Sequence, residues 1–191
     1  SRYLRRSGPG IAASISVSAK LLALALGSTA LAQSFVLACF LGGLALGNAV
    51  LGPAADRTSN PLRLYGRLEL GIAALGLLSL PLLKALAYSG ASLPWKLAAA
   101  GAILLAPTAL MGGTLPALSR WSVPGLDAMR REVSRLYFLN SAGAAAGALA
   151  AGFLLIPVLG IELPVLLAAG LNLAIAVAAI ALARLPRAAD G

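Results

Sequence analysis

The segment from Arg135 to Gly160 constrains the fold more than any other part of the chain. It is long enough to cross a hydrocarbon core of about 30 Å as a helix, and it carries no charge after Arg135. One face of that helix would carry small or amide side chains at helical spacing, namely Asn140, Gly143, Gly147 and Ala151. Small residues at this spacing let two helix backbones approach closely, which is how helices associate in lipid. Because the segment lacks the polar face of a soluble helix, we expect it to be the central packing helix of a membrane bundle.

The composition supports a membrane protein. Of the 191 residues, 60% are hydrophobic and only 11% are charged, whereas about a quarter of a soluble domain is charged. The net charge of +9 is distributed between the apolar stretches, which argues against a nucleic-acid partner. The sequence has no histidine and a single cysteine, so it lacks the common ligands of haem and zinc and cannot form an intrachain disulfide. We expect no metal site and no cofactor.

Apolar stretches of spanning length occur six times, which predicts an all-α membrane domain over residues 9–184. The expected spans are residues 9–26, 30–51, 62–86, 97–118, 136–159 and 163–183, with short terminal segments at 1–8 and 185–191. The first stretch follows a basic start, as a signal peptide does, and cleavage is the alternative. Lys20 interrupts its apolar run, so we interpret it as a span.

The charges predict how the spans thread the membrane. If six spans alternate, every arginine falls on one side, and the other side receives only Lys84, Lys96 and Glu162. The basic side is the cytoplasmic one, so both termini are expected inside. Trp95 and Trp121 flank the fourth span, where aromatic rings prefer the two interfaces.

Two ionisable groups lie at membrane depth, where a charge is costly and marks a candidate site. Lys20 lies more than two turns inside the first span and Glu69 about two turns inside the third, at similar depths from the basic side. We predict an intramembrane ion pair between them. In the alternative, Lys20 extends to the interface and Glu69 meets Arg63 or Arg67.

The connection over residues 52–63 contains an Asp–Arg step and resembles the loop between the second and third helices of the major facilitator superfamily. Asp56 and Arg57 are expected to form a latch that closes the cytoplasmic ends of these two helices. Gln33, Asn140 and Asn172 are uncharged polar groups in apolar surroundings. They would form interhelical hydrogen bonds or line a small polar cavity.

The fourth span contains Pro107, Pro116 and the pair Gly112–Gly113, which predicts a kinked or locally unwound helix. Such a helix either supplies backbone ligands to an ion or substrate, as in transporters, or simply fits its neighbours. The sequence has no Ser/His/Asp arrangement and no phosphate-binding glycine loop, so we expect no catalytic residue.

Four strings occur in an order that resembles a known family: LLALALGSTALAQSFVLACFLGGLALGNAVLGPAADR, PLRLYGRLELGIAALGLL, APTALMGGTLPALSR and RLYFLNSAGAAAGALAAGFLLIPVLG. Together they are similar to the membrane domain of the transmembrane spermidine synthases, also described as fused major-facilitator and spermidine synthase proteins. The resemblance implies a polyamine-related protein whose soluble aminopropyltransferase domain follows the membrane part. In the first span the family's aromatic, Glu or Gln, and Trp positions are replaced by Ser14, Ile15 and Ser18, and only the basic position, Lys20, is kept.

The resemblance predicts a bundle of six helices, similar to one half of a major facilitator, with both termini in the cytoplasm. It would anchor a cytoplasmic catalytic domain of polyamine biosynthesis to the bacterial inner membrane, as part of a transferase whose active site lies outside this chain. That domain would be fused after Gly191 or supplied by a separate chain. The alternatives are a half-size transporter that dimerises and a non-catalytic subunit of a larger complex. Expected partners are the lipid bilayer, other membrane helices and a second copy.

Overall fold

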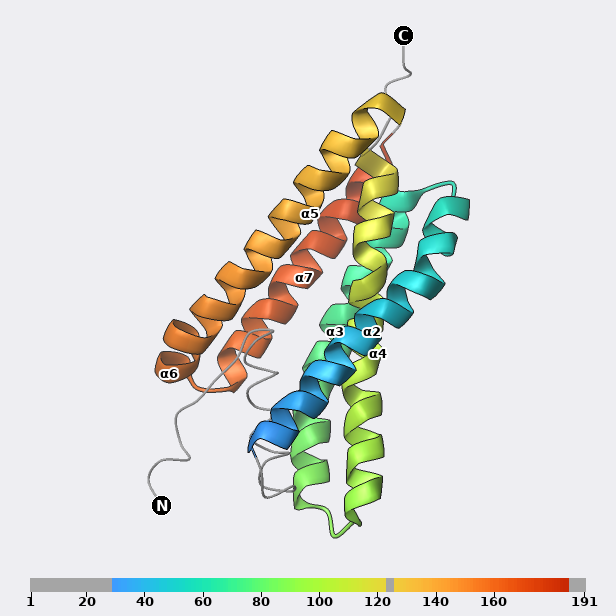
Figure 1. Ribbon diagram of the computed structural model, residues 1–191. Helices are drawn as coiled ribbons and strands as arrows, with labels where there is room; N and C mark the ends of the chain where they lie inside the picture. The colour runs from blue at the N-terminus through green and yellow to red at the C-terminus, as the bar shows by residue number, and fades with distance from the viewer. Residues whose placement is uncertain (1–28, 123–125, 186–191) are drawn as a thin grey trace.

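The computed structural model describes residues 29–122 and 126–185 and is helical throughout these ranges, with no strand in either (Figure 1). Its elements are α2 (Thr29–Arg57), α3 (Pro61–Tyr88), α4 (Leu93–Ser122), α5 (Leu126–Leu149), the π-helical segment η2 (Ala150–Leu155), α6 (Ile156–Leu159) and α7 (Glu162–Leu182). Of residues 126–132 only the backbone is described.

Five of the described segments are long and apolar enough to cross a membrane, which indicates an integral membrane protein. They are Ala30–Arg57, Pro61–Tyr88, Leu93–Ser122, Val133–Leu159 and Glu162–Leu182. These segments overlap the second to sixth predicted spans. The first predicted span, residues 9–26, lies outside the described residues, and the count of six stays a prediction.

The connections gather at two ends of the bundle because successive helices alternate in direction (Figure 1). The α2–α3 and α4–α5 connections and the end of α7 lie at one end, which we call the basic end. Arginines close to these termini, such as Arg57, Arg120 and Arg184, therefore gather there. Lys84 and Glu162 belong to the other end. The predicted separation of the arginines from Lys84 and Glu162 is thus present among the described residues.

Helix α4 is the centre of the described bundle, since it packs along both α2 and α3, while α3 packs along α7. Among the described residues, the segment 135–160 does not form the central helix that was expected. Helix α5 lies at the edge, Asn140 is exposed, and a methyl group added at Gly143 or Gly147 would meet nothing within 4 Å. Of the predicted packing face only Ala151 is buried. Within the described chain, close backbone approach is made by other glycines.

Those glycines lie where α2 crosses α4. A methyl group on Gly43 or Gly47 of α2 would collide with Thr108 or with the backbone of Ala109, respectively. Conversely, a methyl group on Gly112 of α4 would collide with the carbonyl oxygen of Leu44. The two helices therefore touch backbone to backbone on both sides of the seam.

Helix α4 is continuous from Leu93 to Ser122 although it contains Pro107 and Pro116. The expectation of local unwinding at Gly112–Gly113 is therefore wrong. These glycines instead leave room for α2, which is the predicted alternative that the helix simply fits its neighbours. A methyl group on Gly113 would come within 2.7 Å of the Leu51 Cβ atom. The pattern of breakers thus accommodates packing in the described helix.

The fifth span departs from a regular helix near its end. Over Ala150–Leu155 the hydrogen bonds widen to π-helical spacing, and the Ile156 N–H donates to the carbonyl of Ala151. Pro157 follows directly and has no N–H to continue an ordinary ladder. After α6 the chain turns at Gly160, whose φ of 77° and ψ of −173° belong to glycine.

Candidate functional site

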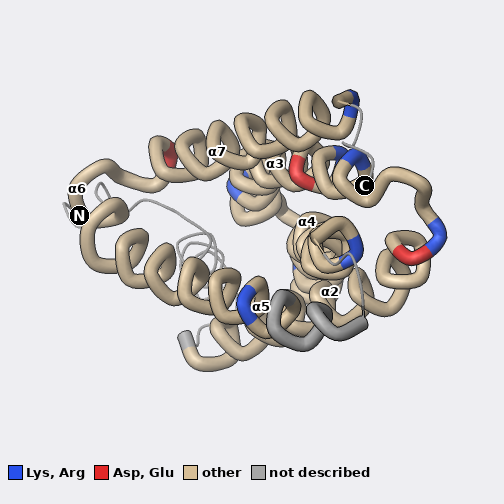
Figure 2. Tube along the Cα trace, turned by 90° about the horizontal axis from the view of Figure 1, so that it is seen from above, with Lys and Arg blue, Asp and Glu red and all other residues tan. Residues whose placement is uncertain are grey.

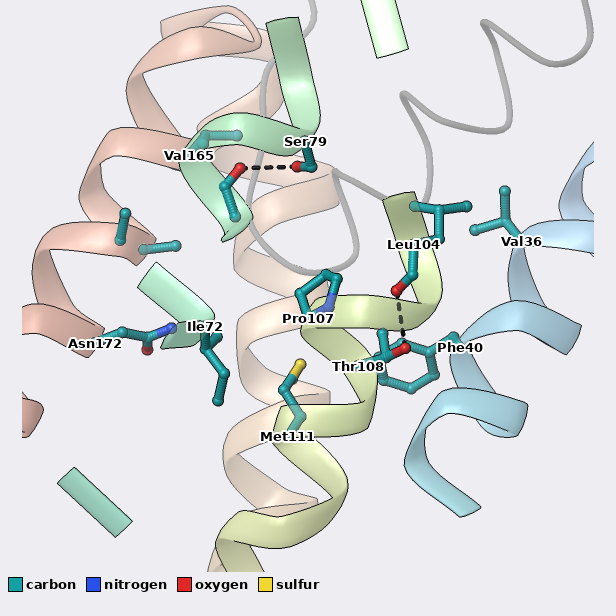
Figure 3. Close-up of a pocket in the computed structure, with 13 residues that line it drawn as sticks. Val36, Phe40, Ile72, Ser79, Leu104, Pro107, Thr108, Met111, Val165 and Asn172 are labelled. Carbon is teal, nitrogen blue, oxygen red and sulfur yellow. Dashed lines mark hydrogen bonds between the residues drawn. The ribbon is translucent and has the colours of Figure 1, made fainter. Parts of the chain in front are cut away.

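A cavity of about 100 Å³ lies among α2, α3, α4 and α7 (Figure 3). It is lined by Val36, Phe40, Ile72, Gly76, Ser79, Leu104, Pro107, Thr108, Met111, Val165, Ala168, Ala169 and Asn172. No α5 residue lines it. The lining is mostly apolar, and each helix contributes residues at helical spacing from one face.

The polar groups of this cavity are few, and two are already engaged. The Ser79 hydroxyl donates to the carbonyl of Gly76 at 2.8 Å, and the Thr108 hydroxyl donates to that of Leu104 at 2.8 Å. Asn172 extends from α7 toward Ile72 (Figure 3) and makes no hydrogen bond to another described residue. Within the described chain, the Asn172 amide therefore has no hydrogen-bond partner in a mostly apolar wall. Its position agrees with the predicted alternative in which Asn172 lines a small cavity. Among the described residues, the lining holds no charged side chain.

Glu69 is the buried acidic residue of the described bundle, with 8% of its surface exposed. Its carboxyl group shares a side-chain hydrogen bond with Tyr65, one turn earlier in α3. Helical spacing places Glu69 on the same face of α3 as the cavity residues Ile72 and Gly76, one turn nearer the basic end. Glu69 thus lies one turn along α3 from the cavity lining, of which it is not a member.

The alternative contact of Glu69 with an arginine is not observed. Arg63 and Arg67 are both exposed, and neither forms an ion pair with Glu69 in the described part of the chain. Lys20 lies outside the described residues, so its pairing with Glu69 stays a prediction. Tyr65 is a partner that the sequence interpretation missed, although its spacing of four residues from Glu69 was a usable signal.

The predicted latch of Asp56 and Arg57 is not formed. Both side chains are exposed in the last turn of α2, and neither makes an ion pair with another described residue. The adjacent Asn60 makes the contact instead. Its side-chain oxygen accepts from the Arg63 N–H at 3.0 Å and caps α3, while its amide nitrogen donates to the carbonyl of Ala183 at 3.0 Å.

Asn60 thereby ties the α2–α3 connection to the end of α7, and we call this contact the Asn60 clasp. A signal for the cap was present, since Asn directly before Pro61 is a typical helix start. The bond to Ala183 joins residues 123 positions apart and could not be inferred from local spacing.

The remaining candidates are peripheral. Gln33 and Asn140 are exposed, and neither bonds to another described residue, so neither forms the predicted interhelical hydrogen bond within the described chain. Trp95 and Trp121 lie in the first and last turns of α4, which confirms their predicted positions. The sequence interpretation missed a salt bridge of 2.6 Å between Lys84 and Glu162 at the end opposite the basic end.

The described residues show no constellation for covalent, acid–base or metal chemistry. No group of three or more His, Cys, Asp or Glu residues that could hold a metal ion occurs among the described residues. Comparisons with protein-family models, with curated proteins and with solved structures found no match to this chain.

Proposed function

We propose that this chain is the membrane domain of a spermidine synthase-like protein and anchors a cytoplasmic aminopropyltransferase to the bacterial inner membrane. The observation that carries the proposal is the Asn60 clasp at the basic end. It fixes the end of α7 to the α2–α3 connection. A domain attached beyond α7 would begin at the basic end, beside the face that we assign to the cytoplasm.

The chemistry of the described bundle supports an anchor better than a carrier. A carrier for a cationic polyamine needs acidic groups along its path, because a cation in the membrane requires compensating charge. The described lining of the cavity has no charged side chain, and Glu69, one turn away along α3, is a single acidic group with a tyrosine partner. An enzyme held beside the bilayer, in contrast, receives or delivers polyamine at the surface without moving it through the bundle.

Purification tests this proposal. The full-length protein is extracted from its own membranes in mild detergent, co-eluting chains are identified, and transfer of an aminopropyl group to putrescine is measured with decarboxylated S-adenosylmethionine. We expect transfer activity in the purified material and none in a mock purification from cells lacking the protein. Absence of both activity and a co-eluting aminopropyltransferase would contradict the proposal.

Reconstitution separates the carrier from the anchor. Proteoliposomes containing the purified protein are given labelled putrescine or spermidine, and uptake is compared with that of protein-free liposomes. We expect equal uptake in both. Protein-dependent accumulation would favour the half-size transporter that dimerises.

A further inference from the structure

Three exposed arginines gather where α3 begins and α7 ends. Arg63 and Arg67 lie in the first two turns of α3, and Arg184 lies just beyond the end of α7. None of them forms an ion pair with another described residue. Figure 2 looks down on the basic end and shows the end of α7 beside α3, with basic residues marked on both helices. This corner therefore carries positive charge that the described residues leave unneutralised.

The Asn60 clasp fixes two of these arginines next to each other. The side-chain oxygen of Asn60 accepts from the backbone N–H of Arg63 itself, at 3.0 Å. Its amide nitrogen donates to the carbonyl of Ala183, the residue directly before Arg184, also at 3.0 Å. One side chain thus holds the backbones from which both guanidinium groups extend. Because like charges repel, this arrangement favours an anion that bridges the two groups.

The contact between α3 and α7 has two flanks. Gly66 marks the line of contact, since a methyl group there would come within 3.0 Å of the α7 backbone. On one flank, Ile72 of α3 and Asn172 of α7 line the cavity. Helical spacing places Arg63 of α3 and Arg184 of α7 on the other flank, away from the cavity. The arginines therefore border a surface of the bundle that is separate from the cavity.

Exposed apolar side chains continue from these arginines along the same flank of both helices. They are Leu70 and Leu77 of α3 and Leu173 and Val177 of α7. Each is between 42% and 60% exposed. They lie roughly 10–20 Å from the arginines along the helix axes, at the depth of lipid acyl chains. We call these four residues, together with Arg63, Arg67 and Arg184, the outer face.

We propose that the outer face binds one anionic phospholipid. Its phosphate is held by the three arginines, and its acyl chains lie along the apolar residues of α3 and α7. Guanidinium groups match phosphate oxygens with paired hydrogen bonds, and basic sites between membrane helices recognise anionic headgroups in this way. A free phosphate ion would use only the arginines, whereas a phospholipid uses the whole outer face. The inference is independent of the polyamine assignment, since it depends only on the helices lying in a bilayer.

Native mass spectrometry of the purified protein tests the site. The protein in detergent is titrated with phosphatidylglycerol, or with phosphatidylcholine, which carries the same chains on a headgroup without net charge. We expect one phosphatidylglycerol to bind per chain, about tenfold more tightly than phosphatidylcholine. Arg63→Gln and Arg184→Gln leave the backbone atoms of the Asn60 clasp in place. Each should weaken phosphatidylglycerol binding about tenfold, because it removes charge-assisted hydrogen bonds.

Arg120→Gln is the matched control. Arg120 is also exposed and lies in the last turn of α4 at the same end of the bundle, but it is not part of the outer face. Its replacement should change binding by no more than about twofold. A loss equal to that of Arg63→Gln, or equal binding of phosphatidylcholine, would overturn the proposal. Displacement of the lipid by an equal concentration of glycerol 3-phosphate would indicate a site for phosphate ions and overturn it too.

Photo-cross-linking decides the location without any substitution, so it applies even if a variant fails to fold. Phosphatidylglycerol with a diazirine in its acyl chain is irradiated with the unmodified protein in vesicles, and the labelled peptides are mapped. We expect labels at Leu70 and Val177 to exceed those at Val50 of α2, which is 68% exposed at a similar depth from the basic end. Even labelling of all three would overturn the proposal. Absence of label from the outer face, as when a protein partner covers it, would overturn it as well.

Discussion

At the scale of single residues, Gly43, Gly47 and Gly112 form the α2–α4 seam, where the two backbones touch because glycine has no side chain. Gly47→Ala would drive a methyl group into the backbone of Ala109. We expect the free energy of unfolding to fall by about 1–3 kcal/mol, as for other overpacked contacts. Gly76→Ala, inside α3 with nothing within 4 Å of the added methyl, is the matched control and should be neutral or stabilising. Thermal unfolding in detergent measures both, and equal changes would show that the seam is not tight.

Asn60 has two roles that two substitutions separate. Asn60→Asp keeps the acceptor that caps α3 but removes the amide donor to Ala183, whereas Asn60→Ala removes both. Each hydrogen bond contributes about 1 kcal/mol, so Ala should cost about twice as much as Asp in thermal stability. Hydrogen exchange of the Ala183 region should increase in both variants. An Asp variant as stable as the wild type, with unchanged exchange, would show that the bond to Ala183 is unimportant.

Single residues also show what the sequence could and could not predict. The depth of Glu69 was predicted because depth follows from counting along one helix. The same counting places Tyr65 one turn before Glu69, so their contact could have been predicted too. The packing face predicted at Asn140, Gly143 and Gly147 meets no other described helix, whereas Gly43 and Gly47, small residues at the same spacing, do. Spacing identifies a surface able to pack closely, but only the tertiary arrangement decides which such surface meets a partner.

At the scale of elements, five predicted spans agree with the described helices because length and apolarity alone define them. The continuity of α4 was not predicted. Pro107 and Pro116 each remove one backbone donor, and a bundle tolerates this loss when neighbouring packing holds the helix together. The π-helical segment before Pro157 was also not predicted, since it depends on how α6 returns to α7.

The turn that joins α6 to α7 depends on one conformation. Gly160→Ala is expected to destabilise the protein by about 1–3 kcal/mol, because a φ of 77° with ψ of −173° is strained for a residue with a Cβ atom. Gly90→Ala provides the control, as Gly90 lies in the connection between α3 and α4 without a positive φ. Melting temperature in detergent is the measurement. Equal shifts would contradict a special requirement at Gly160.

The salt bridge between α3 and α7 should matter little for stability. Lys84 and Glu162 side chains are 43% and 73% exposed, and a pair so accessible contributes about 0–1 kcal/mol. Lys84→Met is therefore expected to leave the melting temperature nearly unchanged. A loss comparable to that of Gly47→Ala would mean that the pair is shielded from water in the membrane.

At the scale of the whole molecule, the arrangement of charge predicts orientation. In a Cys39→Ala background, Ser59→Cys lies in the α2–α3 connection at the basic end and Ser92→Cys in the α3–α4 connection at the other. We expect a membrane-impermeant maleimide to label Ser92→Cys in intact cells and Ser59→Cys only after permeabilisation. The reverse pattern would invert the assignment of the cytoplasmic face, and with it the proposed place of the catalytic domain.

The seam between α2 and α4 also limits how this protein can vary. Most cores adapt to a substitution by exchanging volume between neighbouring side chains, but Gly43, Gly47 and Gly112 have no side-chain volume to exchange. A larger residue at any of them is accommodated only if two whole helices separate, which would also disturb α3 and its contact with α7. Divergence is therefore expected to accumulate on α5 while these three positions stay fixed.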